Sequence, residues 1–173
     1  MGALGADPTT PNSLYYFSEN CLAHSSDHGT TWSSCITAPG LEGPFLRDSG
    51  AFIVKNSKIM FVMRAGKVPL KTVDGGATWK PITSLASLYA HGASFRGELS
   101  WTGKTLVVYG NDRSAIQRRE FGTVVWKSVD DGETWTDETG DLATLSIGHA
   151  RWYESDFYIV TQGEGVIAKR DFE

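Results

Sequence analysis

The chain has 173 residues, of which 40% are hydrophobic and 21% are charged, and its formal net charge is −4. This composition is typical of a globular chain that is long enough to bury a core. The acidic balance excludes the basic face that nucleic-acid binders need, and no apolar run approaches the roughly 20 residues of a membrane span. Neither nucleic acid nor a membrane is therefore an expected partner.

Residues 1–12, "MGALGADPTTPN", are expected to be disordered or tag-like, because they show no strand pattern. They also lack the basic start and apolar stretch of a signal peptide. The first strand-like run is "SLYYFS" at 13–18, which aligns with the second strand of the later repeats, and nothing upstream resembles an inner strand. The location of the protein stays open, with a secreted or extracytoplasmic one favoured.

Further along the chain, short runs rich in Val, Ile, Phe and Tyr are separated by Gly, Asn and Ser. Such runs predict antiparallel strands. They lie at 51–56, 58–64, 92–101, 105–110, 123–128, 156–162 and 165–169. Only 84–93, "SLASLYAHGA", approaches a helical pattern, and it predicts at most one short turn of helix.

One eight-residue motif, [S/T]-x-D-x-G-x-T-W, occurs three times: "SSDHGTTW" at 25–32, "TVDGGATW" at 72–79 and "SVDDGETW" at 128–135. We call it the turn motif. Its copies start 47 and then 56 residues apart (72 − 25 and 128 − 72), and the polar insertion 110–122 accounts for the difference. A period of about 50 residues with four strands predicts the blade of a β-propeller.

The repeats divide residues 13–173 into blades at about 13–38, 45–83, 90–139 and 147–173. The first blade is expected to hold strands two to four and the last to hold strands one to three, with 166–169 matching 124–127 and the fourth motif missing. Incomplete blades expose their edges. Either the terminal pieces close on each other, or a second copy or a partner chain completes the propeller, which makes a homodimer a hypothesis.

Each residue type in the turn motif has a physical role. The aspartate can accept backbone N–H bonds of its own turn, the glycine allows a positive φ, and the tryptophan can pack between neighbouring blades. We expect these residues to be structural: Asp27, Gly29, Trp32, Asp74, Gly76, Trp79, Asp130, Gly132 and Trp135.

The two cysteines, Cys21 and Cys35, flank the first turn motif and should face each other across its hairpin. Opposed Cα atoms of antiparallel strands lie about 4.5–5.5 Å apart, which a disulfide can bridge. A disulfide and a pair of buried thiols both remain open.

The three motif copies resemble the Asp-box, or bacterial neuraminidase repeat, of sialidases and other β-propellers. The resemblance implies an all-β propeller of four-stranded antiparallel blades, three to four per chain. It also implies that the motif lies on the outer side of each blade, remote from the central site.

Ligands of such a fold are expected at the central tunnel, where the inner strands start. The aligned segments "RDSGAF", "AHGASF" and "IGHARW" supply six candidate ligand-binding residues: Arg47, Asp48, His91, Arg96, His149 and Arg151. The candidate catalytic carboxylates are Asp48, Glu98 and Glu154. A merely wet, polar tunnel is the alternative. Close metal-ligand spacing is missing, so we predict no metal and no cofactor.

The leading hypothesis is a module that binds a glycan or another small polar ligand at the tunnel mouth, with Trp101 as the best exposed aromatic for sugar stacking. One alternative is a small glycosidase or sialidase-like hydrolase, or a lyase, and another is a structural or assembly scaffold. Arg47, Arg96 and Arg151 could imitate a sialidase arginine triad. The Arg-Ile-Pro element of sialidases is missing, however, so enzyme activity stays open.

Overall fold

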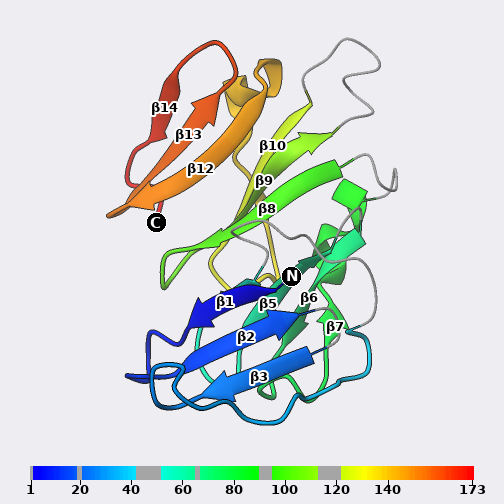
Figure 1. The fold of residues 1–173 in the computed structure, drawn as a ribbon. Coiled ribbons are helices and arrows are strands. Elements are labelled where there is room, and N and C mark those ends of the chain that lie inside the picture. The colour runs from blue at the N-terminus through cyan, green and yellow to red at the C-terminus, as the bar shows by residue number, and fades with distance from the viewer. Residues whose placement is uncertain (1, 19–20, 42–51, 65–66, 90–94, 113–121) are drawn as a thin grey trace. The chain divides into compact units, whose positions relative to one another are not determined.

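The computed structural model describes residues 2–18, 21–41, 52–64, 67–89, 95–112 and 122–173. It is built almost entirely of antiparallel strands, as the repeats predict (Figure 1). The chain divides into two compact units, residues 1–83 and 84–173. In the described part of the chain, no helix is long and apolar enough to cross a bilayer.

The first unit contains two sheets. The strands of its first sheet are β1 (Ala3–Ala6), β2 (Leu14–Ser18) and β3 (Cys21–Ser25), in that order. The second sheet follows the order β4 (Phe52–Val54), β5 (Met60–Arg64), β6 (Lys67–Thr72) and β7 (Lys80–Pro81). The two sheets share one apolar core.

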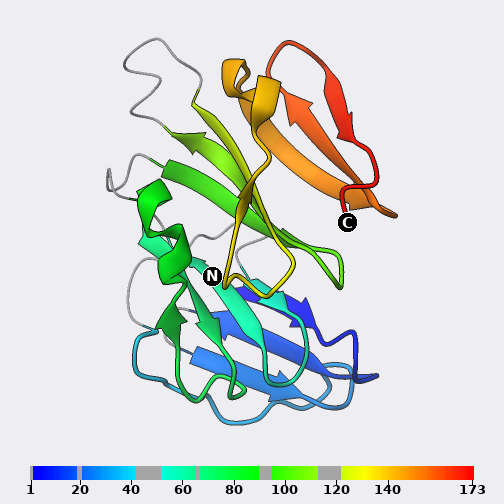
Figure 2. The same ribbon diagram turned by 180° about the vertical axis from the view of Figure 1, so that it is seen from behind.

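The second unit repeats this plan. A 3-10 helix, η1 (Thr83–Tyr89), precedes a sheet of β8 (Phe95–Trp101), β9 (Leu106–Asp112), β10 (Thr123–Ser128) and β11 (Thr136–Asp137). A second 3-10 helix, η3 (Gly140–Thr144), leads to a sheet of β12 (Ile147–Tyr153), β13 (Asp156–Thr161) and β14 (Val166–Lys169). Both views show the β12–β14 sheet facing the β8–β11 sheet (Figure 2).

The prediction for the N-terminal residues was wrong, because Ala3–Ala6 form β1 and pair with β2 as an inner strand. The sequence hides this strand because it contains no β-branched or aromatic residue. Small residues are needed there: a Cβ added to Gly5 would lie 2.6 Å from Val54 and 3.1 Å from Phe52 of the neighbouring sheet. The first sheet therefore has strands one to three, and its fourth strand is reduced to one bridge between Leu22 and Ile36.

The three turn motifs fold into nearly identical hydrogen-bonded turns. In the first, Asp27 Oδ1 accepts bonds from the Ser25 hydroxyl and the Thr31 amide, both at 2.8 Å, and Oδ2 accepts the Thr31 hydroxyl at 2.6 Å. Ser25 Oγ in turn accepts the Gly29 amide at 2.8 Å. The same bonds recur around Asp74 and Asp130 within 0.2 Å.

The motif tryptophans close the same turn in all three copies. Each indole N–H donates to the carbonyl of the motif glycine at 3.0–3.1 Å. The three glycines have φ of 86°, 94° and 87°, the left-handed region that a side chain disfavours. Trp79 is buried and its ring centroid lies 6.3 Å from that of Phe17 in the neighbouring sheet. In this copy the tryptophan therefore packs between two sheets.

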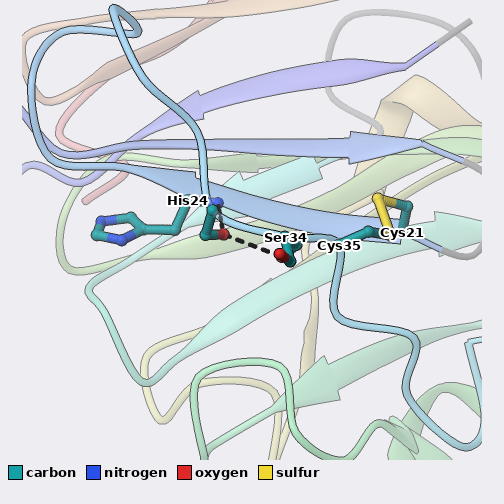
Figure 3. Close-up of a disulfide and its surroundings, with 5 residues drawn as sticks. Cys21, His24, Ser34 and Cys35 are labelled. Atoms are coloured by element: carbon teal, nitrogen blue, oxygen red, sulfur yellow. Dashed lines mark hydrogen bonds between the residues drawn. A yellow bond between two sulfur atoms is a disulfide. The ribbon is translucent and has the colours of Figure 1, made fainter.

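A disulfide joins Cys21 of β3 to Cys35, which resolves the two alternatives that the sequence left open (Figure 3). The two Cα atoms are 5.3 Å apart and 14 residues apart in sequence. The bond lies beside the bridge between Leu22 and Ile36, and it ties down the chain that follows the first turn motif. Closing a loop of this length contributes about 3 kcal/mol by restricting the unfolded chain.

The alignment of the last repeat requires a correction by one residue. The amides of His28, Gly75 and Phe172 donate to the carbonyls of Asn12, Lys58 and Ser155, at 3.1, 3.0 and 2.8 Å. In the first two motifs this amide belongs to the fourth motif residue. Phe172 therefore occupies the fourth motif position as well, Lys169 the first and Asp171 the aspartate position. Residues 166–169 thus match 125–128 and not 124–127.

Substitution of Gly76 should separate its two constraints. A Cβ at Gly76 would lie 2.3 Å from Leu22 of the neighbouring sheet, whereas at Gly29 it would meet only Trp32 and Leu14, at 3.4 Å or more. Both glycines have a left-handed φ, 86° at Gly29 and 94° at Gly76. We expect Gly76→Ala to lower the unfolding free energy by about 1–3 kcal/mol more than Gly29→Ala, because of this overpacking. Denaturant unfolding checks the difference, and equal losses would contradict it.

The motif carboxylates should make stability depend on acid pH. Hydrogen bonds, first from the motif threonine, lower the pKa of each motif aspartate from 3.8 to about 2. Because the folded-state pKa is depressed, this stabilisation is present above about pH 4 and is lost as the pH falls through 2.

The substitution Asp74→Asn tests this. We expect a lower melting temperature at neutral pH and a flatter decline between pH 4 and pH 2 than in the wild type. Asp141→Asn, which removes a carboxylate outside the turn motifs, is the control. Parallel pH profiles for the wild type and Asp74→Asn would argue against the role given to the carboxylate.

Candidate functional site

The inner strands of the second unit bring together three of the predicted site residues. Glu98 lies on β8, and His149 and Arg151 lie on β12. His149 Nδ1 is 3.6 Å from Glu98 Oε1. The imidazole is 68% exposed, and the carboxylate beneath it is 18% exposed. A largely enclosed carboxylate therefore meets an accessible imidazole at the start of β12.

A β-bulge places His149 over Glu98. The register of β12 with β13 shifts by one between Ile147 and Ala150, so that Gly148 and His149 together oppose Val160. A bulge re-aims a side chain and is common beside functional sites. Without the extra residue, the alternation of the strand would turn His149 and Ala150 to opposite faces. The bulge is therefore the local feature that creates the pair.

Side chains of β9 hold the bulge from both sides. Asn111 binds the backbone of Ile147 twice, donating to its carbonyl at 2.8 Å and accepting its amide at 3.3 Å. The hydroxyl of Tyr109 accepts the amide of Ala150 at 3.3 Å. The amide side chain of Asn111 thus acts like a strand backbone, and the two residues between these anchors, Gly148 and His149, are exposed.

Tyr109 also fixes the carboxylate. Its hydroxyl donates to Glu98 Oε2 at 2.5 Å, and the ring is buried against Phe157 with centroids 5.6 Å apart. Burial, followed by the Glu98 carboxylate, raises the pKa of Tyr109 above its ordinary value of 10.0. The phenol therefore stays protonated, and it positions Glu98 while leaving Oε1 turned toward His149.

Arg151 adds a cation to the group. Its Nη1 donates to the carbonyl of Ala150 at 2.8 Å, and its charge lowers the pKa of Tyr109 slightly, against the stronger effects of burial and Glu98. The site thus combines three groups. The imidazole of His149 belongs to the bulge, the guanidinium of Arg151 follows it on β12, and the carboxylate of Glu98 on β8 faces the imidazole. This set can bind hydroxyl groups or a small polar molecule, because it offers both donors and acceptors.

Other predicted residues are not part of this group. Arg47, Asp48 and His91 lie outside the described residues, and so does the side chain of Arg96, although its backbone belongs to β8. Glu154 follows the end of β12, five residues after His149, which is roughly 16 Å of extended chain.

The carboxyl pair of a glycosidase lies about 5–10 Å apart, whereas the side chains that contact Glu98 among the described interactions are those of Tyr109 and His149. No group of three or more metal-ligating side chains occurs among the described residues.

The aromatic residues differ from expectation. Trp101, predicted to be exposed, is half-buried, and its buried indole N–H has no hydrogen-bond partner among the described residues. Tyr153, at the end of β12, is exposed instead. The sequence analysis did not identify Tyr109 or Asn111 as site residues. Asn111 is nevertheless a polar residue at the end of the apolar strand run "TLVVYGN". That polar residue is the signal in the sequence that could have indicated the bonds from β9 to the bulge of β12.

The hydrogen bond between Tyr109 and Glu98 should contribute to stability. In Tyr109→Phe the carboxylate would lose its donor while it remains largely enclosed. Hydrogen bonds to charged groups contribute about 1.5–3 kcal/mol, so we expect a loss of unfolding free energy in this range. Tyr153→Phe, which removes an exposed hydroxyl, is the matched control. Equal stability of the two variants would contradict the positioning role of Tyr109.

Comparison with known proteins gives a fold but no family. No protein-family model and no curated protein sequence matches the chain. Among solved structures, the GH74 xyloglucanase from Xanthomonas campestris is similar over 92% of this chain and 26% of its own, with 14% identity and a TM-score of 0.63. An ancestral GH74 enzyme is similar over 98% of this chain and 22% of its own, with 15% identity and a TM-score of 0.58.

A third solved structure shares the fold. YCF48 from Cyanidioschyzon merolae is similar over 90% of this chain and 50% of its own, with 13% identity and a TM-score of 0.55. The chain thus spans between about a fifth and a half of the structures that it resembles. With identities this low, the likeness shows the fold alone, and the fold is a β-propeller of three- and four-stranded antiparallel sheets.

Proposed function

We propose that the chain is a β-propeller module that binds a glycan or a similar polyhydroxylated ligand at the bulge of β12. The observation that carries this proposal is the pair of Glu98 and His149. The carboxylate is fixed by the buried Tyr109, and the exposed imidazole lies 3.6 Å from its free oxygen. Such a pair can accept one sugar hydroxyl and donate to its neighbour.

The chemistry of the site favours binding over hydrolysis. Glycoside hydrolysis needs two carboxyl groups across the scissile bond. Within the described residues, the side chains that contact Glu98 are those of Tyr109 and His149, and neither is a carboxylate. The hydrolase alternative therefore needs a second carboxyl group, for which Glu154 and Asp48, the latter outside the described part of the chain, are the candidates. The GH74 neighbours support a ligand of carbohydrate type.

The finer family assignment is also part of this proposal. We infer that the chain is a propeller of the Asp-box type, supported by the three turns in which aspartate, serine or threonine, glycine and tryptophan make the same bonds. In this assignment the motif aspartates have a structural role only. Their carboxylates bind groups of their own turn, at the end of the third strand of each sheet and away from the inner strands.

Titration with defined oligosaccharides tests the function. We would use xyloglucan-derived oligosaccharides and a panel of neutral and sialylated glycans, with calorimetry for Kd and reducing-sugar release for hydrolysis. We expect binding without release. Glu98→Gln and His149→Ala should each weaken the Kd about 10-fold or more, because each removes one of the two hydrogen-bonding groups of the pair.

His28→Ala removes an exposed imidazole from a turn motif and is the matched control, with an unchanged Kd expected. Release of reducing sugar that depends on Glu98 would favour the hydrolase alternative. Binding that is unaffected by both Glu98→Gln and His149→Ala, or no binding across the panel, would contradict the proposal.

A further inference from the structure

The first and last sheets each leave one face uncovered. The middle strands β5 and β9 are buried on both faces, whereas β2 and β13 alternate between buried and accessible residues. On the first sheet the uncovered residues are Leu4, Leu14, Tyr16 and Trp32, which we call the N-face. On the last sheet they are Tyr158, Val160 and Val166, which we call the C-face.

The residues of each face lie together. Leu4 and Tyr16 are cross-strand partners, and the rings of Tyr16 and Trp32 are edge to face with centroids 6.2 Å apart. On the last sheet, Val160 and Val166 are cross-strand partners on β13 and β14. The N-face is therefore a contiguous apolar patch. The C-face is an apolar pair, Val160 and Val166, beside Tyr158, whose ring lies under the Arg170 guanidinium.

The contact between the first two sheets shows which side chains pack against each other where two neighbouring sheets meet, and we use it as the template for both faces. There, Leu22 approaches the motif glycine of the next sheet so closely that a Cβ at Gly76 would lie 2.3 Å from it. Phe17 lies beside the motif tryptophan Trp79, with ring centroids 6.3 Å apart. One sheet thus contributes Phe17 and Leu22, and the following sheet receives them with its motif glycine and tryptophan.

The repeat register places the C-face and the N-face in these two roles. Lys169 occupies the first motif position, as Ser25 does, so Val166 is equivalent to Leu22 (169 − 3 and 25 − 3). Val160, the partner of Val166, is then equivalent to Phe17, the partner of Leu22. On the other side, Gly29 and Trp32 are equivalent to Gly76 and Trp79.

The residues of the two faces are exposed, whereas the equivalent residues of the template contact are buried. Val166 is 62% exposed where Leu22 is 1% exposed, and Trp32 is 41% exposed where Trp79 is 4% exposed. At Gly29 an added Cβ would meet no atom closer than 3.4 Å, so the space that Leu22 fills at Gly76 is open there. The N-face carries the glycine and tryptophan of the template, Gly29 and Trp32, and the C-face carries an apolar residue at each position of Phe17 and Leu22, namely Val160 and Val166.

We propose that the C-face of one chain docks on the N-face of a second copy of the same chain. Val166 would enter the space over Gly29, and Val160 would pack against Trp32, as Leu22 and Phe17 do at Gly76 and Trp79. The contact is heterologous, because two different faces meet, and two copies in a ring make it twice. This inference is independent of the proposed ligand site, which uses Glu98 and His149.

Two charged substitutions test the contact separately. Tyr16→Glu disrupts the N-face and Val166→Glu the C-face, and Val129→Glu, at an exposed motif position outside both faces, is the control. The mass of each protein is measured by light scattering over a concentration series, with circular dichroism to verify folding. We expect the wild type and the control to contain two or more chains, and each face variant to be monomeric.

The decisive sample is the mixture of the two face variants. Tyr16→Glu keeps an intact C-face and Val166→Glu keeps an intact N-face, so the mixture should form a heterodimer through one contact. If Val166→Glu fails to fold, Val160→Lys replaces it on the same face. A monomeric wild type, a variant of one face that still dimerises, or folded variants that do not combine would overturn the proposal.

Discussion

The hydrogen bonds of one carboxylate in each turn motif determine how the sheets of this protein can pack. Asp74 binds the amide and the hydroxyl of Thr78 as well as the hydroxyl of Thr72, and this fixes the path of the chain into Trp79. The indole then donates back to Gly76 and packs beside Phe17 of the preceding sheet. A polar turn at the surface thereby positions the largest side chain of the core between two sheets.

The candidate site depends on a similar use of polar side chains at a different place. Tyr109 and Asn111 bind the backbone of β12 on either side of its bulge, and Tyr109 also orients Glu98. Buried polar groups of this kind are stable only when each finds its partner. The same residues that hold the strand therefore also define which oxygen of Glu98 faces His149.

The sequence contained most of the fold but only part of the site. The turn motif could be recognised because its five defined positions each have a fixed role in the turn. The runs "MFVMR" and "LVVY" could be recognised as strands because they are apolar and buried on both faces. The strand Ala3–Ala6 could not be recognised, because its residues have low strand propensity. Small residues are needed there because Phe52 and Val54 of the neighbouring sheet approach Gly5 closely. The one-residue error at Val166–Lys169 arose because an apolar run matches two registers equally well.

The sequence placed both Glu98 and His149 on inner strands, but it did not predict that they contact each other. Their contact requires the bulge at Gly148, and a bulge is set by tertiary bonds from Tyr109 and Asn111 that no local pattern shows. The Cys21–Cys35 disulfide was accessible as one of two alternatives, because cross-strand distance follows from hairpin geometry while oxidation does not.

The central claim is that the carboxylate-centred turns are ordered structural units. Hydrogen exchange of the Gly29, Gly76 and Gly132 amides, which donate to the first motif residue at 2.8–3.0 Å, tests it most directly. These amides lie in turns outside the strand ladders, and their hydrogen-bond acceptor is the hydroxyl of the first motif residue. We predict protection comparable to that of neighbouring strand amides and its loss at Gly76 alone in Thr72→Ala. Exchange of all three at the rate of an unstructured chain would contradict the account.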